Sequence, residues 1–430
     1  PTDLGVFGIS AELQPEQTLA ALHAIHRTVA ELAREGPTGT ELERARNILE
    51  ARLLRQAESV EGQAVQLAEW EAVGDWRLAD VYLDRIRAAT VDELRRVAGE
   101  YLDLERATVL AYRPDAAPPL GWDAATLLQM LRGAAPAGGP AATPPAGGTE
   151  APGAAAPVGG VETALGRAMA RRGAENGVHF FELEGGSTIV VMPRRESALV
   201  AMSIAVAGGS LQETAERTGS TALMARASVR GTTTRDAAQL AEATEALGGV
   251  ITVSVGSDLL LWSLSVPARH FRAAFPLLAD AALRPVFPEG EVERERKVLA
   301  SDLEQLRDDM YRYPLRLFHE AAFGGHPYGT PLAVAEGALP GLTAGGLRAW
   351  HQAHVLGATP WVIVVGGVDP EEVAGTVAHE LSGLAATERA SFPLPAPWPN
   401  GMRERAESRA KAQTALVLGF PGPARNDEDA

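Results

Sequence analysis

Residues Gly219–Thr232 read GSTALMARASVRGT, and this stretch decides how the rest of the chain is interpreted. It opens with a capping-type Gly-Ser-Thr, continues through good helix formers and stops at Gly231. A helix in this register places Ala222, Ala225 and Arg226 on one face, because residues three and four apart are neighbours on a helix surface. We therefore expect a short helix that presents two methyl groups and one guanidinium together.

The spacing of these three positions is that of the inverted zinc-peptidase motif, HxxEH. That motif supplies two imidazoles for the metal and a carboxylate that activates water. Here Ala222, Ala225 and Arg226 occupy the three positions. Neither methyl group can bind zinc, and the guanidinium places a fixed positive charge where the cation would sit. The sequence thus has the spacing of a metal-binding helix without its ligands.

The bulk composition describes an ordinary globular chain of two or more domains. It has 430 residues, of which 46% are hydrophobic and 22% charged. The formal net charge of −16 argues against nucleic acid or an anionic membrane as partner. The charge is compatible with basic peptide substrates, although acidity also serves solubility. No cysteine is present, which excludes disulfides, thiolate metal sites and a cysteine nucleophile. The sequence shows no apolar stretch of membrane-spanning length.

The first part of the chain is predicted to be helical between two strands. Pro15 begins a helix with an apolar period of about 3.6 residues, and Gly36-Pro37 ends it. Thr40 is expected to cap the next helix, with Glu43 completing a capping box. The other expected elements are strands at Leu4–Ser10 and Ala107–Tyr112, helical pattern to about Gly74, and helices at Tyr82–Ala89 and Val91–Tyr101.

Between Gly133 and Gly160 the composition changes to Ala, Gly, Pro and Thr, with Glu150 as the only charge. Such a segment buries too little apolar surface to offset the entropy of ordering it, so a flexible or partly extended linker is predicted. A polyproline ligand is the alternative, but the segment lacks basic anchors.

A second unit of strands and helices is predicted from Val178 onward. VHFFELEGGSTIVVM indicates two strands joined by a hairpin at Gly185-Gly186. The other expected strands are Ala198–Ala207, Val250–Val255, Leu259–Val266 and Trp361–Val365, and Ala412–Phe420 is expected to begin a further domain. The expected helices are Asp236–Leu247, His270–Leu283, one from Pro288, one from Thr343 and Pro370–Leu381.

Two segments of the chain recur in the same order. ELERARNILEARL (Glu41–Leu53) aligns without gaps on EVERERKVLASDL (Glu291–Leu303), 250 positions later. Thr90–Tyr112 aligns on Thr343–Val365 with a shift of 253. Two matches at nearly the same offset indicate two copies of one α+β unit, the first of which is expected to lack its beginning.

This layout resembles the insulinase/pitrilysin family of zinc peptidases, which includes the mitochondrial processing peptidases. Four motifs of the second unit carry the resemblance: AVAGGSLQETAERTG (Ala205–Gly219), VRGT (Val229–Thr232), ERERKVLASDL (Glu293–Leu303) and HPYGTP (His326–Pro331). In addition, residues 1–112 resemble the family's second domain, and AQTALVLGFPGP (Ala412–Pro423) resembles the start of its fourth. The resemblance implies an α+β fold of tandem homologous domains, each a mixed or antiparallel sheet covered by helices, that enclose a peptide chamber.

The resemblance also assigns the site positions. It places the family's two zinc histidines on Ala222 and Arg226, its general-base glutamate on Ala225 and its distal glutamate ligand on Asp302. One carboxylate cannot hold zinc alone. The chain is therefore predicted to contain no metal ligands and no catalytic residue, with zinc expected in a missing catalytic domain before Pro1. The substrate-binding residues are unknown and are expected beyond Ala430.

The remaining histidines offer no second site. His23/His26 and His351/His354 are HxxH pairs on expected helices, but neither has further convergent ligands, so ordinary helix-surface histidines explain them better. His326 lies in the HPYG loop, which the resemblance marks as structural.

The domain organisation implied by the resemblance has four parts. Residues 1–112 form a C-terminal-type domain of a first half, incomplete at its N-terminus, and 113–172 form an Ala/Gly/Pro-rich linker. Residues 173–388 form a degenerate N-terminal-type peptidase domain, and 389–430 a linker and the start of a truncated further domain.

The expected function is the non-catalytic central portion of a zinc metalloendopeptidase, forming the wall of the chamber. The expected partners are a peptide or unfolded protein and the catalytic half of the same or another chain. The alternative is a non-enzymatic scaffold or peptide-binding subunit of the same fold, and an HxxEH motif before Pro1 distinguishes the two. The sequence does not define the compartment. Relatives with Ala/Pro-rich tethers are often exported in bacteria, which favours the periplasm.

Overall fold

The computed structural model describes residues 15–73, 77–103, 123–133 and 169–384, short stretches at 7–9, 405–409 and 414–418, and the single residues 11, 13, 107, 109 and 403. Contacts divide the chain into two compact units, Pro1–Val158 and Gly159–Ala430. No helix among the described residues is long and apolar enough to cross a membrane.

The described part of the first unit is helical. A 3₁₀ turn at Pro15–Gln17 leads into α1 (Thr18–Glu35), and Gly36, with φ of 77°, ends that helix as the sequence predicts. The other helices are α2 (Gly39–Ala57), α3 (Val60–Val73), α4 (Leu78–Ala88), α5 (Val91–Tyr101) and α6 (Ala124–Gly133). The predicted strands Leu4–Ser10 and Ala107–Tyr112 lie largely outside the described residues.

Two expectations for this unit need correction. The capping box of α2 is formed by Thr38 and Glu41, not by Thr40 and Glu43, because Thr38 has the extended backbone that a cap requires. Helix α6 lies inside the segment 113–172 predicted as a linker. Its sequence AATLLQMLRG is apolar enough to pack, and Leu131 is only 4% exposed.

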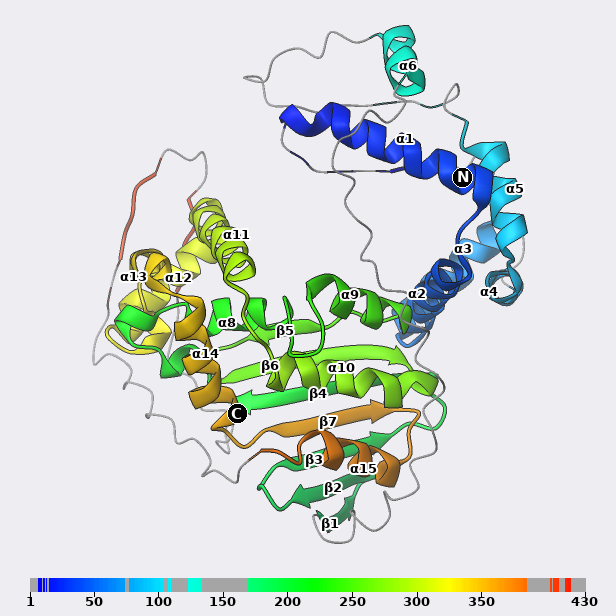
Figure 1. Ribbon diagram of the computed structural model, residues 1–430. Helices are drawn as coiled ribbons and strands as arrows, with labels where there is room; N and C mark the ends of the chain where they lie inside the picture. Colours follow the sequence, from blue (N-terminus) through cyan, green and yellow to red (C-terminus); the bar gives the residue numbers. More distant parts are fainter. Residues whose placement is uncertain are drawn as a thin grey trace. The chain divides into compact units, whose positions relative to one another are not determined.

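The second unit is built on one mixed sheet (Figure 1). Its strands are β1 (Met169–Glu175), β2 (Val178–Leu183), β3 (Thr188–Pro193), β4 (Leu199–Ala207), β5 (Thr252–Val255), β6 (Leu259–Pro267) and β7 (Trp361–Gly366). The order is β1-β2-β3-β7-β4-β6-β5, with β3 and β7 parallel and the other pairs antiparallel. The predicted hairpin between β2 and β3 is present, with Gly186 at a positive φ. The predicted α+β class is confirmed.

Helices pack against this sheet and against one another. They are α8 (Ser220–Ser228), α9 (Ala237–Ala246), α10 (Phe271–Leu283), α11 (Glu289–Asp308), α12 (Arg312–Phe323), α13 (Leu332–Ala338), α14 (Ala344–His351) and α15 (Pro370–Glu380). Helix α10 packs on β4 and β6, and α15 packs on β2 and β3. Alternate residues of β4 and β6 face α10, and Ile204 and Trp262 have no exposed surface. This single apolar layer positions α8, which carries Ala222, Ala225 and Arg226.

The structure differs from the sequence prediction at four places in this unit. Strand β1 begins inside the predicted linker. Helix α8 ends at Ser228, because Gly231 and Thr232 bridge to Asp236 and Pro285 instead of continuing the helix. Helices α12 and α13 were not expected. Residues 414–418 form no strand; a strand needs a hydrogen-bonding neighbour, and Leu416 is 90% exposed.

The repeated segments adopt matching structure. Glu41–Leu53 lies in α2 and Glu291–Leu303 lies in α11. Thr90 and Thr343 both act as N-caps, their hydroxyls accepting from the amides of Glu93 and Gly346. Equivalent caps at equivalent positions agree with a duplicated unit.

Candidate functional site

The N-terminus of helix α8 is held by a buried carboxylate from the preceding turn. Gly219 enters the helix in a left-handed conformation, with φ of 89°, and has no side chain to cap it. The carboxylate of Glu213 accepts from the amides of Gly219 (2.9 Å) and Thr221 (2.8 Å) instead. Burial raises the pKa of the Glu213 carboxyl, and these two hydrogen bonds oppose the rise. The helix is therefore fixed at the end that leads to Ala222.

The structure brings together the positions that the resemblance assigns to the metal site. Ala222 is partly buried against the core, and Ala225 is 1% exposed. Arg226 Nη2 lies 2.5 Å from Asp302 Oδ2 on α11, with the two side chains 36% and 43% exposed. Asp302 is thus directed at α8 and bound to a guanidinium.

A second ion pair joins α11 to the residues that follow α8. Arg230 Nε lies 2.7 Å from Glu295 Oε1, and the Glu295 side chain is only 6% exposed. Arg226 and Arg230 are one helical turn apart in sequence, and Glu295 precedes Asp302 by two turns. Two arginine–carboxylate pairs therefore cross-link α11 to α8 and to the residues that follow α8.

The residues present do not fit a zinc ion. A protein zinc site takes at least three nitrogen, sulfur or oxygen ligands, whereas this cradle offers two methyl groups, a guanidinium and one carboxylate. Within the described residues, no group of three or more His, Cys, Asp or Glu side chains is placed to hold a metal ion. The arrangement of Arg226 and Asp302 is that of a structural ion pair.

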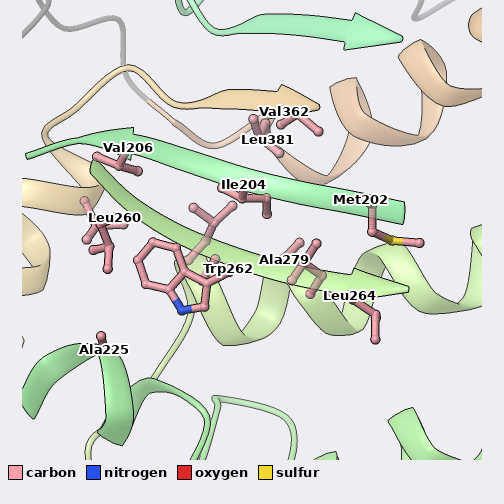
Figure 2. Close-up of a cluster of buried hydrophobic side chains, with 14 of the residues drawn as sticks. Met202, Ile204, Val206, Ala225, Leu260, Trp262, Leu264, Ala279, Val362 and Leu381 are labelled. Atoms are coloured by element: carbon pink, nitrogen blue, oxygen red, sulfur yellow. The ribbon is translucent and has the colours of Figure 1, made fainter. Parts of the chain in front are cut away.

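Ala225 belongs to the hydrophobic core rather than to a cleft. It lies on the side of α8 that faces Trp262 and Leu260 (Figure 2). The indole nitrogen of Trp262 donates to Ser228 Oγ (2.9 Å), and Ser228 Oγ donates to the carbonyl of Ala225 (2.7 Å). The position assigned to the general base is thus tied by its backbone to β6.

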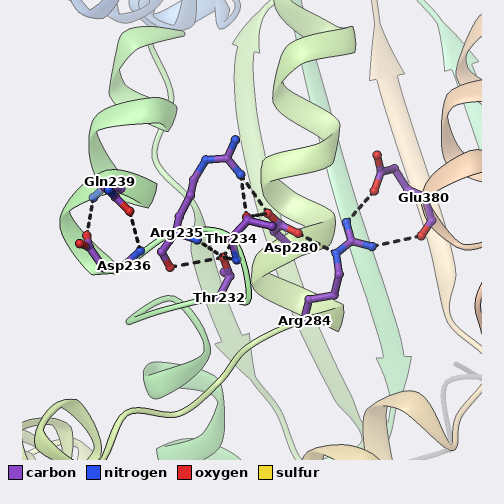
Figure 3. Close-up of polar contacts among 8 residues, drawn as sticks. All are labelled: Thr232, Thr234, Arg235, Asp236, Gln239, Asp280, Arg284 and Glu380. Carbon is purple, nitrogen blue, oxygen red and sulfur yellow. Dashed lines mark hydrogen bonds and ion pairs between the residues drawn. The ribbon is translucent and has the colours of Figure 1, made fainter. Parts of the chain in front are cut away.

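A buried polar cluster holds the loop after α8 (Figure 3). Asp280 on α10 accepts from Thr234 Oγ1 (2.6 Å), Arg235 Nη1 (3.0 Å) and Arg284 Nε (2.6 Å). Arg284 also pairs with Glu380 on α15, at 2.6 Å. The Asp280 side chain is 7% exposed, so its charge is compensated inside the fold. Nothing in the local sequence signals this cluster, because its members come from three separate segments.

The histidines singled out in the sequence do not converge on a site. His23 and His26 lie on α1, in the first unit. His351 is 4% exposed and its Nε2 donates to the carbonyl of Ala282 (2.8 Å); burial lowers its pKa. His354 packs on Trp350, and burial lowers its pKa as well.

The HPYG loop is held by its own aromatic contacts. His326 Nδ1 accepts from the amide of Tyr328, and the two rings meet edge to face. Arg316 on α12 donates to the carbonyl of Thr330 and fixes the end of the loop. His326 therefore acts within the loop structure.

Comparison with known proteins assigns the family. The family described as "Insulinase (Peptidase family M16)" matches residues 189–336, and the "Peptidase M16 inactive domain" matches residues 2–49 and 341–430. The chain belongs to the insulinase family of peptidases.

The relatives carry protease names. An uncharacterized zinc protease of Rickettsia felis is 26% identical over 243 residues, 56% of this chain and 58% of that protein. The uncharacterized zinc protease YmxG of Bacillus subtilis is 24% identical over 249 residues, again 56% and 58%. A crystal structure of a protease from Helicobacter pylori is similar with a TM-score of 0.48 and 19% identity, covering 53% of this chain and 56% of that one. The chain thus spans a little over half the length of these relatives.

Proposed function

We propose that this chain is a non-catalytic portion of a zinc metalloendopeptidase and forms part of the wall of its peptide chamber. The Arg226–Asp302 ion pair is the main support for this proposal. The guanidinium of Arg226 is a permanent, covalently attached cation, and it occupies the position that the resemblance assigns to the metal. The match of residues 2–49 and 341–430 to an inactive domain supports it.

Hydrolysis is assigned to another domain, where zinc would be bound. The segments of this chain that would bind metal are instead cross-linked by Arg226–Asp302 and Arg230–Glu295. Their contribution is rigidity: one pair from α8 and one from the residues after it, both to α11, hold the wall in one geometry without a metal. The catalytic half of the same or another polypeptide, and a peptide or unfolded protein as substrate, are the partners proposed.

Reconstitution tests this function. The proposed catalytic half, a domain of this family that carries HxxEH, is produced separately, and cleavage of a quenched fluorogenic peptide is measured with and without this chain. We expect hydrolysis to rise when the chain is added and to be absent with the chain alone. A catalytic half that hydrolyses the peptide equally well without this chain contradicts the wall role.

A non-enzymatic scaffold or peptide-binding subunit is the second candidate. Ala225, at the assigned general-base position, is packed into the core beside Trp262, which is the arrangement of a structural domain. A native reading frame without any HxxEH motif favours this candidate over the peptidase.

A further inference from the structure

The segment 405–409 lies against α11 and α12, and we call it the strap. Its sequence is Arg-Ala-Glu-Ser-Arg, it forms no helix or strand, and none of its residues is buried. Its contacts with the helices come from Arg405, Glu407 and Arg409. These are alternate residues, which is the spacing at which side chains of an extended segment share one side.

Arg409 is held at the C-terminus of α11. Its Nη1 donates to the carbonyl of Arg307 (2.6 Å), one of the last four carbonyls of α11, which have no amide partner within the helix. Its guanidinium carbon also lies 4.3 Å from the ring centre of Tyr313, in the first turn of α12, which is within the range of a cation–π contact. A helix C-terminus and an aromatic face both favour a cation, so this place suits a guanidinium.

Two carboxylates add ionic contacts to the strap. Tyr313 Oη donates to the carboxylate of Glu407 (3.1 and 3.2 Å), and Arg409 Nε donates to the same carboxylate (2.7 Å). The hydrogen bond from Arg409 lowers the pKa of the Glu407 carboxyl, which therefore carries its charge at neutral pH. Arg405 Nη2 lies 3.5 Å from Oε2 of Glu320 on α12, whose side chain is only 10% exposed.

Arg307, Tyr313 and Glu320 form what we call the α11–α12 platform. Contacts that do not involve the strap hold two of its members. Arg307 Nε donates to Glu336 of α13 (2.7 Å), and Glu320 Oε1 accepts from the amide of Leu332 (3.3 Å). The platform is therefore supported by the fold, and it presents places for two guanidiniums four residues apart.

The contacts that hold the strap are polar. They are ion pairs, hydrogen bonds and one cation–π contact, and Ala406 is the only apolar residue of the strap. Exposed contacts of this kind each contribute little, whereas ordering five residues costs conformational entropy. The attached and released states of the strap should therefore be close in free energy.

We propose that the α11–α12 platform is a recognition site for guanidinium groups whose ligand is the strap. The strap binds reversibly and leaves the helices while the second unit stays folded, so it acts as a latch between the α11–α12 platform and the residues after 409. The inference concerns two parts of this chain and does not depend on whether the assembled protein hydrolyses peptides.

Spin labelling of the full chain measures the attachment. The chain has no cysteine, so Ser408→Cys gives a single attachment point for a nitroxide on the strap. The electron paramagnetic resonance spectrum separates an immobilised fraction, the attached strap, from a mobile fraction. We expect both in the labelled parent. Their mobile-to-immobilised ratio should rise at least about threefold between about 0.05 M and about 1 M sodium chloride, because salt screens exposed charges.

Two neighbouring tyrosines supply matched variants. Tyr313→Ala removes the ring beneath Arg409 and the hydroxyl that donates to Glu407, whereas Tyr311→Ala makes the same change at a side chain that is 88% exposed. The former should raise the mobile-to-immobilised ratio at least about fivefold, and the latter should leave it unchanged. Arg409→Gln, a change confined to the strap, should release it similarly without moving the urea midpoint, so the test stands even if Tyr313→Ala lowers stability.

Two small amides test whether the platform recognises the guanidinium itself. L-argininamide carries the head group of Arg405 and Arg409, and L-lysinamide carries the same charge without the planar fork. At equal concentration and ionic strength, L-argininamide should raise the mobile-to-immobilised ratio at least about threefold more than L-lysinamide does.

Four results overturn the proposal. A fully mobile label in the parent means that the strap does not bind. No release by Arg409→Gln, with equal effects of Tyr313→Ala and Tyr311→Ala, removes the platform as its site. Equal release by the two amides reduces the contact to charge alone. An immobilised fraction that falls when the protein is diluted makes a second copy the holder of the strap.

Discussion

Zinc binding can be introduced between α8 and α11 by three substitutions. Ala222→His, Arg226→His and Asp302→Glu supply two imidazoles one helical turn apart and a carboxylate from the facing helix. The contact between Arg226 and Asp302 already shows that side chains from α8 and α11 meet at this place. Ala225 is left unchanged, because a carboxylate there would be buried beside Trp262.

The expected changes in the free energy of unfolding follow from the exposure of the ion pair and from the binding of zinc to the folded state. Loss of the ion pair should lower the free energy of unfolding of the metal-free variant by only about 0.5–1 kcal/mol, because both side chains are more than one-third exposed and water screens them. Free zinc at about 100 times the dissociation constant should then raise it by about 2.7 kcal/mol.

Urea unfolding with zinc and with a chelator measures both effects. The control variant carries the same two histidines with Asp302→Ala, and it should gain far less from zinc because the third ligand is missing. A folded triple variant whose stability does not respond to zinc, or a control that responds equally, refutes the assignment of these positions to a former metal site.

Three further predictions concern buried polar groups of the second unit, and each is measured by urea unfolding. Asp280→Asn should lower the free energy of unfolding by about 3 kcal/mol, because the buried carboxylate loses charge-assisted hydrogen bonds from three donors. The control Asp236→Asn, at an exposed helix cap, should lower it by under about 0.5 kcal/mol. Equal losses in the two variants would contradict the role given to burial. Because burial lowers the pKa of His351 in the folded protein, the unfolded chain takes up the proton at a higher pH than the folded protein does. Stability should fall by up to about 1.4 kcal/mol per pH unit below the ordinary value of 6.5, and a His351→Gln variant should show a flatter profile between pH 7.5 and 5.5. Trp262→Phe and Ser228→Ala should each lower the free energy of unfolding by about 1–2 kcal/mol. Both remove the hydrogen bond from Trp262 Nε1 to Ser228 Oγ, so the double variant should lose less than the sum of the two single losses. Full additivity would contradict a stabilising role of this hydrogen bond.

Local sequence signals explain what could be predicted about the site. The helix over Ala222–Arg226 followed from helix-forming residues and the glycines that bound it, and the Thr90 and Thr343 caps lie at equivalent positions of the repeat. Asp302 was placed opposite α8 only through the resemblance, since composition does not relate residues 76 positions apart.

The remaining features depend on contacts that no sequence pattern encodes. The carboxylate of Glu213 caps α8 from a turn six to eight residues before the amides it accepts from, and Arg230 pairs with Glu295, 65 positions later on α11. No helix was expected between the one from Pro288 and the one from Thr343, whereas α12 and α13 lie there and α13 begins directly after Pro331.

The metal content of the purified full chain, measured together with its peptidase activity, tests the central claim most directly. Zinc analysis after dialysis against micromolar zinc should find far less than one equivalent per chain, and a quenched unfolded-protein substrate should stay intact. Stoichiometric zinc that Asp302→Ala removes, together with cleavage by the chain alone, would contradict the account.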